Sequence, residues 1–162
     1  MPEFENPPAT VDVPASRVTR IVAADAPVSL VWRCLVEPDL LARWLGDIAA
    51  FPDGVIPGAM GRFAWTGEVV LAARITAVEP EQRFAFAWAE GFVSNRASSV
   101  EITLSPIDTG TQVHLVESGF PLEGDDATKR EALRSLAAGW TVELDELVDL
   151  AEHLHSSEQP AT

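Results

Sequence analysis

The chain has 162 residues, 47% of them hydrophobic, and this length and composition suit a single globular domain. Its formal net charge of −14 repels nucleic-acid phosphates and anionic lipid heads, so nucleic acid is not an expected partner. No apolar run reaches the roughly 18 residues that a membrane span requires. Cys34 is the single cysteine, which excludes an intrachain disulfide and favours a cytoplasmic location.

The two ends of the chain differ in composition from the middle. Residues 1–15 combine four prolines with three acidic residues and predict a disordered leader. Residues 156–162 form a polar tail. One folded domain is therefore expected over residues 16–155.

The domain begins with a strand and two short helices. Residues 17–24 are rich in β-branched side chains and predict a strand. Apolar residues then recur at three- and four-residue spacing over residues 28–36, which is typical of a helix with one apolar face. Pro38 ends this helix because a proline disfavours helix in the residue before it. A second short helix is expected over residues 39–45.

A series of strands follows, separated by turn signals. The predicted strands are residues 62–65, 68–78, 83–88, 99–104 and 111–117. Short strands at this spacing are typical of an antiparallel meander. In residues 84–88 the aromatic side chains share one face and the alanines the other, so a one-residue slip would expose three large rings.

The last predicted element is a long amphipathic helix. Thr128 and Glu131 fit a capping box at its start. Apolar residues continue at helical spacing to Leu154, over roughly 38 Å at 1.5 Å per residue. The order of elements predicts an α+β fold in which a curved antiparallel sheet wraps around this C-terminal helix.

Such a sheet leaves a cavity wherever it curls further than the helix can fill. The small helix residues Ala137, Gly139 and Ala151 leave room there. The alternative is solid core, which an aromatic stripe facing a helix forms more often, because protein interiors tolerate few voids. The candidate cavity residues are Trp44, Phe63, Trp65, Phe84, Phe86, Trp88, Ile102, Leu115, Glu117, Leu136, Trp140 and Leu144.

Several short segments carry a family resemblance by their order and spacing. They are Val31-Trp32, Arg43-Trp44, Pro80, Gly110-Thr111, Glu117-Ser118-Gly119-Phe120, and Gly139-Trp140 with Leu144 and Leu147. From about Arg17 to Leu154 the chain resembles the SRPBCC/START-like superfamily, and within it the group similar to the C-terminal domain of the activator of Hsp90 ATPase. The resemblance implies a helix-grip fold with a hydrophobic pocket between sheet and C-terminal helix. It brings no catalytic motif. The glycines of residues 57–61, near the expected pocket mouth, are more widely spaced than is usual in this group.

No sequence pattern points to a catalytic residue, a metal site or a cofactor. The chain lacks the G-x-S-x-G motif and the glycine-rich phosphate loops. His114 is expected on the outer sheet face, and the spacing of His153 and His155 does not suit a metal site. Cys34 is expected to be a small buried thiol.

Glu117 is the one carboxylate expected to point inward, because it continues the face of Val113 and Leu115. Two roles remain open for it: an ion pair with an arginine at the cavity edge, or a polar anchor or proton shuttle for a bound molecule. Arg62, Arg74 and Glu68 are further strand residues within reach of a cavity.

Three functions are compatible with these features. The first is a non-enzymatic carrier or sensor that binds a small hydrophobic or amphipathic ligand. The second is a cyclase- or dehydratase-like enzyme acting on a polyketide or aromatic substrate, and the third is a chaperone-associated interaction domain. Tryptophan, phenylalanine and leucine side chains left on the outer sheet face would also supply a homodimer contact.

Overall fold

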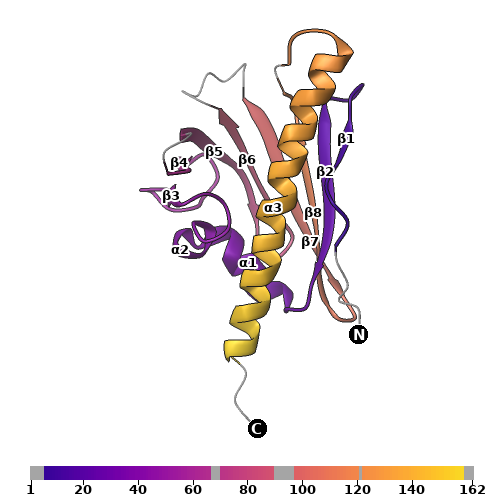
Figure 1. Cartoon of the computed structure of the whole chain (residues 1–162). Coiled ribbons are helices and arrows are strands. Elements are labelled where there is room, and N and C mark those ends of the chain that lie inside the picture. Colours follow the sequence, from indigo (N-terminus) through magenta and orange to yellow (C-terminus); the bar gives the residue numbers. More distant parts are fainter. Residues whose placement is uncertain (1–5, 67–69, 90–96, 121, 159–162) are drawn as a thin grey trace.

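A single antiparallel sheet and one long helix make up most of the molecule. The computed structural model describes residues 6–66, 70–89, 97–120 and 122–158. Within these ranges eight strands form one open sheet in the order β1-β2-β8-β7-β6-β5-β4-β3. The long helix α3 lies across one face of this sheet (Figure 1). The predicted helix-grip α+β fold is therefore confirmed.

The bounds of the elements are as follows. The strands are β1 Thr10–Asp12, β2 Arg17–Ala24, β3 Ile48–Ala50, β4 Met60–Ala64, β5 Val70–Glu79, β6 Arg83–Ala89, β7 Ser98–Ile107 and β8 Gly110–Ser118. The helices are α1 Val28–Val36, α2 Pro38–Leu41 and α3 Asp126–Glu158. None of the helices in the described ranges is long and apolar enough to cross a membrane.

The path of the chain brings β8 between β2 and β7. Helices α1 and α2 carry the chain from β2 to β3 at the far edge of the sheet, and the meander from β3 to β8 returns to β2. Burial alternates strictly along β8, so Val113, Leu115 and Glu117 face α3. His114 lies on the opposite face, as predicted.

The helix boundaries differ from the sequence expectation at three places. Helix α2 ends at Leu41, where residues 39–45 had been expected to be helical. Helix α3 begins at Asp126 and is capped by Asp125, whose Oδ1 accepts a hydrogen bond from the backbone N–H of Thr128 at 2.8 Å. The capping box on Thr128 and Glu131 is therefore wrong. The helix also continues to Glu158, through the start of the predicted polar tail.

The predicted disordered leader is wrong for residues 6–15; residues 1–5 lie outside the described ranges. Thr10–Asp12 forms the edge strand β1 beside β2, and the Asn6 side chain bonds the backbone of Ala23 in both directions. We call residues 6–13 the N-terminal strap. Composition alone missed it, because the groups that hold it lie far along the sequence.

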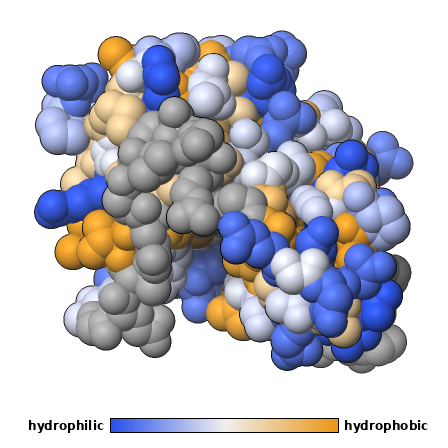
Figure 2. All heavy atoms as spheres, turned by 90° about the horizontal axis from the view of Figure 1, so that it is seen from above, coloured by the Kyte–Doolittle hydropathy of each residue, from blue (hydrophilic) through white to orange (hydrophobic). Residues whose placement is uncertain are grey.

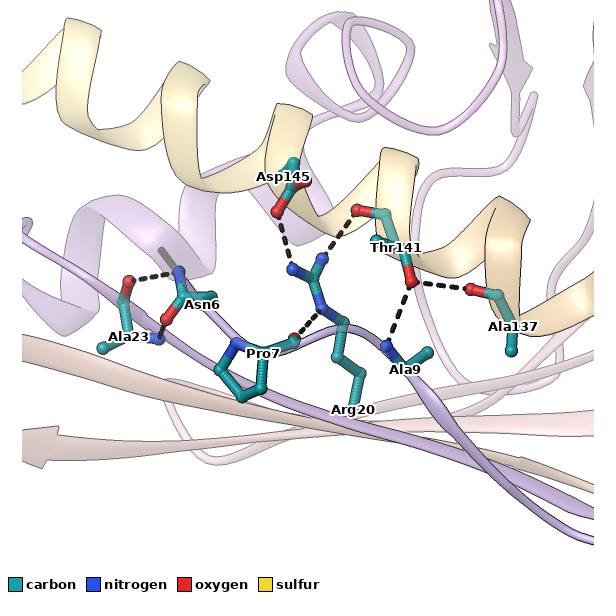
Figure 3. Close-up of polar contacts among 8 residues, drawn as sticks. All are labelled: Asn6, Pro7, Ala9, Arg20, Ala23, Ala137, Thr141 and Asp145. Atoms are coloured by element: carbon teal, nitrogen blue, oxygen red, sulfur yellow. Dashed lines mark hydrogen bonds and ion pairs between the residues drawn. The ribbon is translucent and has the colours of Figure 1, made fainter. Parts of the chain in front are cut away.

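Arg20 is the centre of the attachment between strap and helix (Figure 3). Its guanidinium donates to the carbonyl oxygen of Pro7 at 2.9 Å, to that of Thr141 at 2.6 Å and to Asp145 at 2.7 Å. The Ala9 N–H donates to the Thr141 hydroxyl. Arg20 is 2% exposed, so a buried charge ties β2, the strap and α3 together.

The outer surface gives no support to the predicted aromatic dimer contact. The large hydrophobic residues that are exposed within the described ranges are all aliphatic or methionine: Ile21, Ile48, Ile56, Met60, Val70, Ile107 and Val142. A homodimer stays a prediction.

Candidate functional site

A cavity of about 270 Å³ lies between α3 and the sheet. It is lined by Leu45, Trp65, Leu71, Trp88, Glu117, Ser135, Leu136, Gly139, Trp140 and Glu143. Ser135 and Gly139 on α3 are exposed, so the cavity opens to solvent along the helix. Seen from the end at which α3 begins, the surface is hollowed beside that helix (Figure 2). The interior is therefore not solid at this place.

The structure divides the predicted cavity residues into two groups. Five of them line the cavity: Trp65, Trp88, Glu117, Leu136 and Trp140. The other seven, Trp44, Phe63, Phe84, Phe86, Ile102, Leu115 and Leu144, are fully buried core and lie outside the cavity lining. The core interpretation was thus right for these seven positions.

Glu117 is held at the buried side of the cavity by three donors from three elements. Its Oε2 accepts hydrogen bonds from Trp88 Nε1 of β6 at 2.7 Å and from Ser98 Oγ of β7 at 2.6 Å. Its Oε1 accepts one from Trp140 Nε1 of α3 at 2.7 Å. The rings of Trp88 and Trp140 stack with their centroids 5.7 Å apart. We call Trp88, Ser98, Glu117 and Trp140 the Glu117 cluster.

Among the described residues, no positive charge balances Glu117. The carboxylate is 1% exposed, and no ion pair joins it to a basic residue of the described ranges. Burial raises the pKa of Glu117, and the hydrogen bonds from Ser98, Trp140 and Trp88 oppose the rise because they favour the ionised form.

No arginine of the described ranges forms an ion pair with Glu117, and an arginine partner stays a prediction. Arg62 and Arg74 alternate onto the solvent face of their strands and are exposed. Glu68 lies outside the described residues. Glu117 points inward as predicted and keeps its role as a candidate anchor or proton-transfer group.

Glu143 is a second carboxylate of the cavity, and the sequence analysis did not single it out. It accepts a hydrogen bond from Trp65 Nε1 at 3.3 Å and is half-buried. The pKa of Glu143 is raised to about 7, chiefly by burial and further by the charges of Glu146 and Asp47. Hydrogen bonds from Trp65 and the backbone of Gly46 oppose the rise.

Gly46 reaches Glu143 because of its backbone conformation. Its φ of +80° favours glycine, and an added Cβ would lie 2.8 Å from the carbonyl oxygen of Ala64. The turn between α2 and β3 therefore approaches β4 closely and directs a backbone N–H toward α3.

Gly139 lines the cavity and carries no side chain that would fill it. An added Cβ at Gly139 would meet nothing within 4 Å. Ala137 and Ala151 are instead buried outside the cavity lining. Glycine in the middle of a helix is destabilising by roughly 0.5–1 kcal/mol relative to alanine, so the space has an energetic cost.

The described residues hold no group of three or more histidine, cysteine or acidic side chains placed to bind a metal. Cys34 is buried as predicted, and burial raises the pKa of its thiol to about 11. The thiol is therefore not activated as a nucleophile.

Comparison with known proteins supports the fold assignment. The sequence model of the family described as "Activator of Hsp90 ATPase homolog 1-like protein" matches residues 25–152. No curated protein sequence matches the chain.

Several solved structures share the fold. Protein MLL2253 from Mesorhizobium loti is 26% identical with a TM-score of 0.72, and the match covers 85% of this chain and 97% of MLL2253. DynU16, from the dynemicin biosynthetic locus, is 24% identical with a TM-score of 0.72, and the match covers 89% of this chain and 50% of DynU16. SA2116 from Staphylococcus aureus, a protein of unknown function, is 16% identical with a TM-score of 0.73. The match covers 88% of this chain and 96% of SA2116.

Proposed function

The chain belongs to the activator of Hsp90 ATPase homolog 1-like family, and from this premise we propose that it binds a small hydrophobic or amphipathic molecule in the cavity between sheet and α3. The protein would act as a carrier or sensor rather than as an enzyme. The fold supports ligand binding in general. The cavity itself, with indole walls and the buried carboxylate of Glu117, is the observation that carries the more specific proposal.

The size of the cavity supports a small ligand. Its 270 Å³ lies just below the lower end of the range of about 300–1,000 Å³ that is common for drug-sized ligands. Burial of apolar ligand area contributes roughly 25 cal/mol per Å², so the indole and leucine walls would supply most of the affinity. A single aromatic ring with a short side chain suits these dimensions.

The Glu117 cluster suits a ligand anchor. A carboxylate has about four lone-pair sites, and the cluster uses three of them. Among the described donors, Oε1 receives only Trp140, so the remaining capacity lies on this oxygen. A hydroxyl or N–H group of a ligand would orient itself on this oxygen.

Tryptophan fluorescence tests the proposal directly. Trp65, Trp88 and Trp140 line the cavity, so a bound molecule should change their emission. We expect saturable binding of at least one member of a panel of single-ring aromatic compounds and short fatty acids, alcohols and amines. The proposal fails if no member of the panel binds.

Two substitutions at Gly139, one large and one small, form a matched pair of variants for this test. Gly139→Leu places a large side chain in the free space beside the cavity and should abolish binding, whereas Gly139→Ala should retain it. Both variants should be at least as stable as the wild type, because both residues favour helix more than glycine by about 0.5–1 kcal/mol. Unchanged binding in Gly139→Leu would place the ligand elsewhere.

An enzymatic role is the second candidate, and the raised pKa of Glu117 inside the cavity favours it. In a cyclase- or dehydratase-like reaction this carboxyl group would take a proton from carbon and return it to oxygen. Turnover of an aromatic or polyketide substrate that is lost in Glu117→Gln, with substrate binding retained, would support this candidate. A chaperone-associated role stays a prediction.

A further inference from the structure

The cavity has an unusual charge pattern. Its charged lining residues are two glutamates, Glu117 and Glu143, and the described lining residues include no lysine, arginine or histidine. The indole N–H groups of Trp65, Trp88 and Trp140 are engaged with these two carboxylates. An anionic ligand would meet negative charge with no cation among the described lining residues, so the cavity disfavours acids.

The two carboxylates differ in the partners that they already have. Glu117 is buried and accepts three hydrogen bonds from neutral donors. Glu143 is half-buried and has one side-chain donor, at the longer distance of 3.3 Å, besides the backbone of Gly46. Glu143 therefore retains more acceptor capacity toward a ligand.

Two neighbouring carboxylates add negative charge around Glu143, and a third lines the same cavity. Glu146 lies on the same helix, Asp47 belongs to the turn before β3, and Glu117 lines the same cavity from β8. Trp65 and Gly46 contribute only neutral donors. A ligand cation at this position would relieve repulsion among several carboxylates at once.

We propose that the cavity selects small amphipathic ligands that carry a protonated amine, with the ammonium group bound by Glu143 and the apolar body among Trp65, Trp88 and Trp140. The inference rests on the proposed ligand-binding function and names the chemical class of the ligand. Indole rings add to the selectivity, because a cation within about 6 Å of an aromatic face is attracted by its quadrupole.

A series of three probes of the same size separates charge from shape. Phenethylamine, 2-phenylethanol and phenylacetate carry the same ring on a short chain that ends in a cation, a neutral group or an anion. Titration calorimetry with the full-length chain should show that the amine binds about tenfold or more tightly than the alcohol, and that phenylacetate does not bind detectably.

Glu143→Gln is the decisive variant, because it removes the charge and keeps the size of the side chain. The affinity for phenethylamine should fall about tenfold, while the affinity for 2-phenylethanol should not change. Asp149→Asn is the matched control: it removes one negative charge from an exposed position of the same helix, and it should leave both affinities unchanged.

The pH dependence gives an independent readout. Between about pH 5.5 and about pH 8 the amine stays protonated while Glu143 ionises, so the affinity for phenethylamine should rise. This rise should be absent in Glu143→Gln and absent for 2-phenylethanol.

The outcomes distinguish the two proposals. Equal binding of amine and alcohol, or an unchanged amine affinity in Glu143→Gln, would overturn the amine proposal and leave the cavity as a general apolar site. Binding of none of the three probes would overturn the amine proposal, and the broader panel would then decide the proposed function.

Discussion

Two buried polar clusters lie on α3, and they are built in opposite ways. On the strap side, the Arg20 guanidinium donates to two backbone carbonyl groups and to the carboxylate of Asp145 (Figure 3). On the cavity side, Glu117 receives three neutral donors and no cation from the described residues. The first cluster balances its charge, and the second has no balancing cation among the described residues.

From this difference we expect the Arg20 cluster to contribute mainly to stability and the Glu117 cluster to contribute to function. Arg20 has its ionic partner within the protein, and the groups around it lie outside the lining of the Glu117 cavity. Glu117 has a raised pKa and lines a cavity that a small molecule can enter. A buried charge beside a cavity, with no balancing cation among the described residues, is a better candidate for chemistry than one held in an ion pair. Three substitutions test this comparison.

Arg20→Ala should have the largest effect on stability. It leaves the carbonyl oxygens of Pro7 and Thr141 without their donor and detaches the N-terminal strap from α3. We expect the free energy of unfolding to fall by about 3 kcal/mol, measured by urea denaturation. Asp145→Asn should cost much less, because the Asp145 side chain is 55% exposed. Equal losses in the two variants would contradict a central role for the guanidinium.

Glu117→Gln should have an intermediate effect. An amide has one acceptor oxygen, so one of the two indole N–H groups of Trp88 and Trp140 would lose its acceptor. The unsatisfied donor should lower the free energy of unfolding by about 1–3 kcal/mol, with a change in near-ultraviolet circular dichroism. Ser98→Ala keeps both indoles satisfied and should cost less. A larger loss in Ser98→Ala would show that the indoles do not depend on Glu117.

Glu143→Gln should have the smallest effect on the unliganded protein, and its sign should depend on pH. The folded state holds the Glu143 proton up to about pH 7, above the ordinary carboxyl value near 4.5. The contribution of this group to stability is therefore complete below about pH 4.5 and is lost as the pH rises toward 7. We expect Glu143→Gln to have a higher Tm than the wild type at pH 8, with a smaller difference at pH 5. A constant difference across this range would contradict the raised pKa.

The sequence was sufficient to predict those strands and helices whose structure follows from the pattern of neighbouring residues. Alternation along β6 and β8 predicted which side chains face α3, because the large apolar residues of each strand share one face. The strap was missed because β1 depends on Arg20 and Thr141, which lie outside the predicted leader. Proline content describes the isolated segment and says nothing about such distant partners.

The site was only partly predictable for a related reason. Alternation shows that Phe84 and Trp88 both point inward, yet only Trp88 lines the cavity. The difference depends on where α3 lies along the strand, which the pattern does not contain. Glu143 was not singled out from the sequence, although it follows Trp140 by three residues and Gly139 by four. That spacing places all three residues on one face of the helix, so the sequence contained a signal that Glu143 lies beside the cavity.

Gly139 has a consequence for the diversification of this scaffold. Since an added Cβ at this position would meet no atom of the protein within 4 Å, we expect larger side chains at this single position to reduce the guest volume step by step. Alanine, valine and leucine at position 139 would form a series of size filters on one framework. Selectivity for molecular size could then evolve, or be engineered, separately from the charge preference set by Glu143.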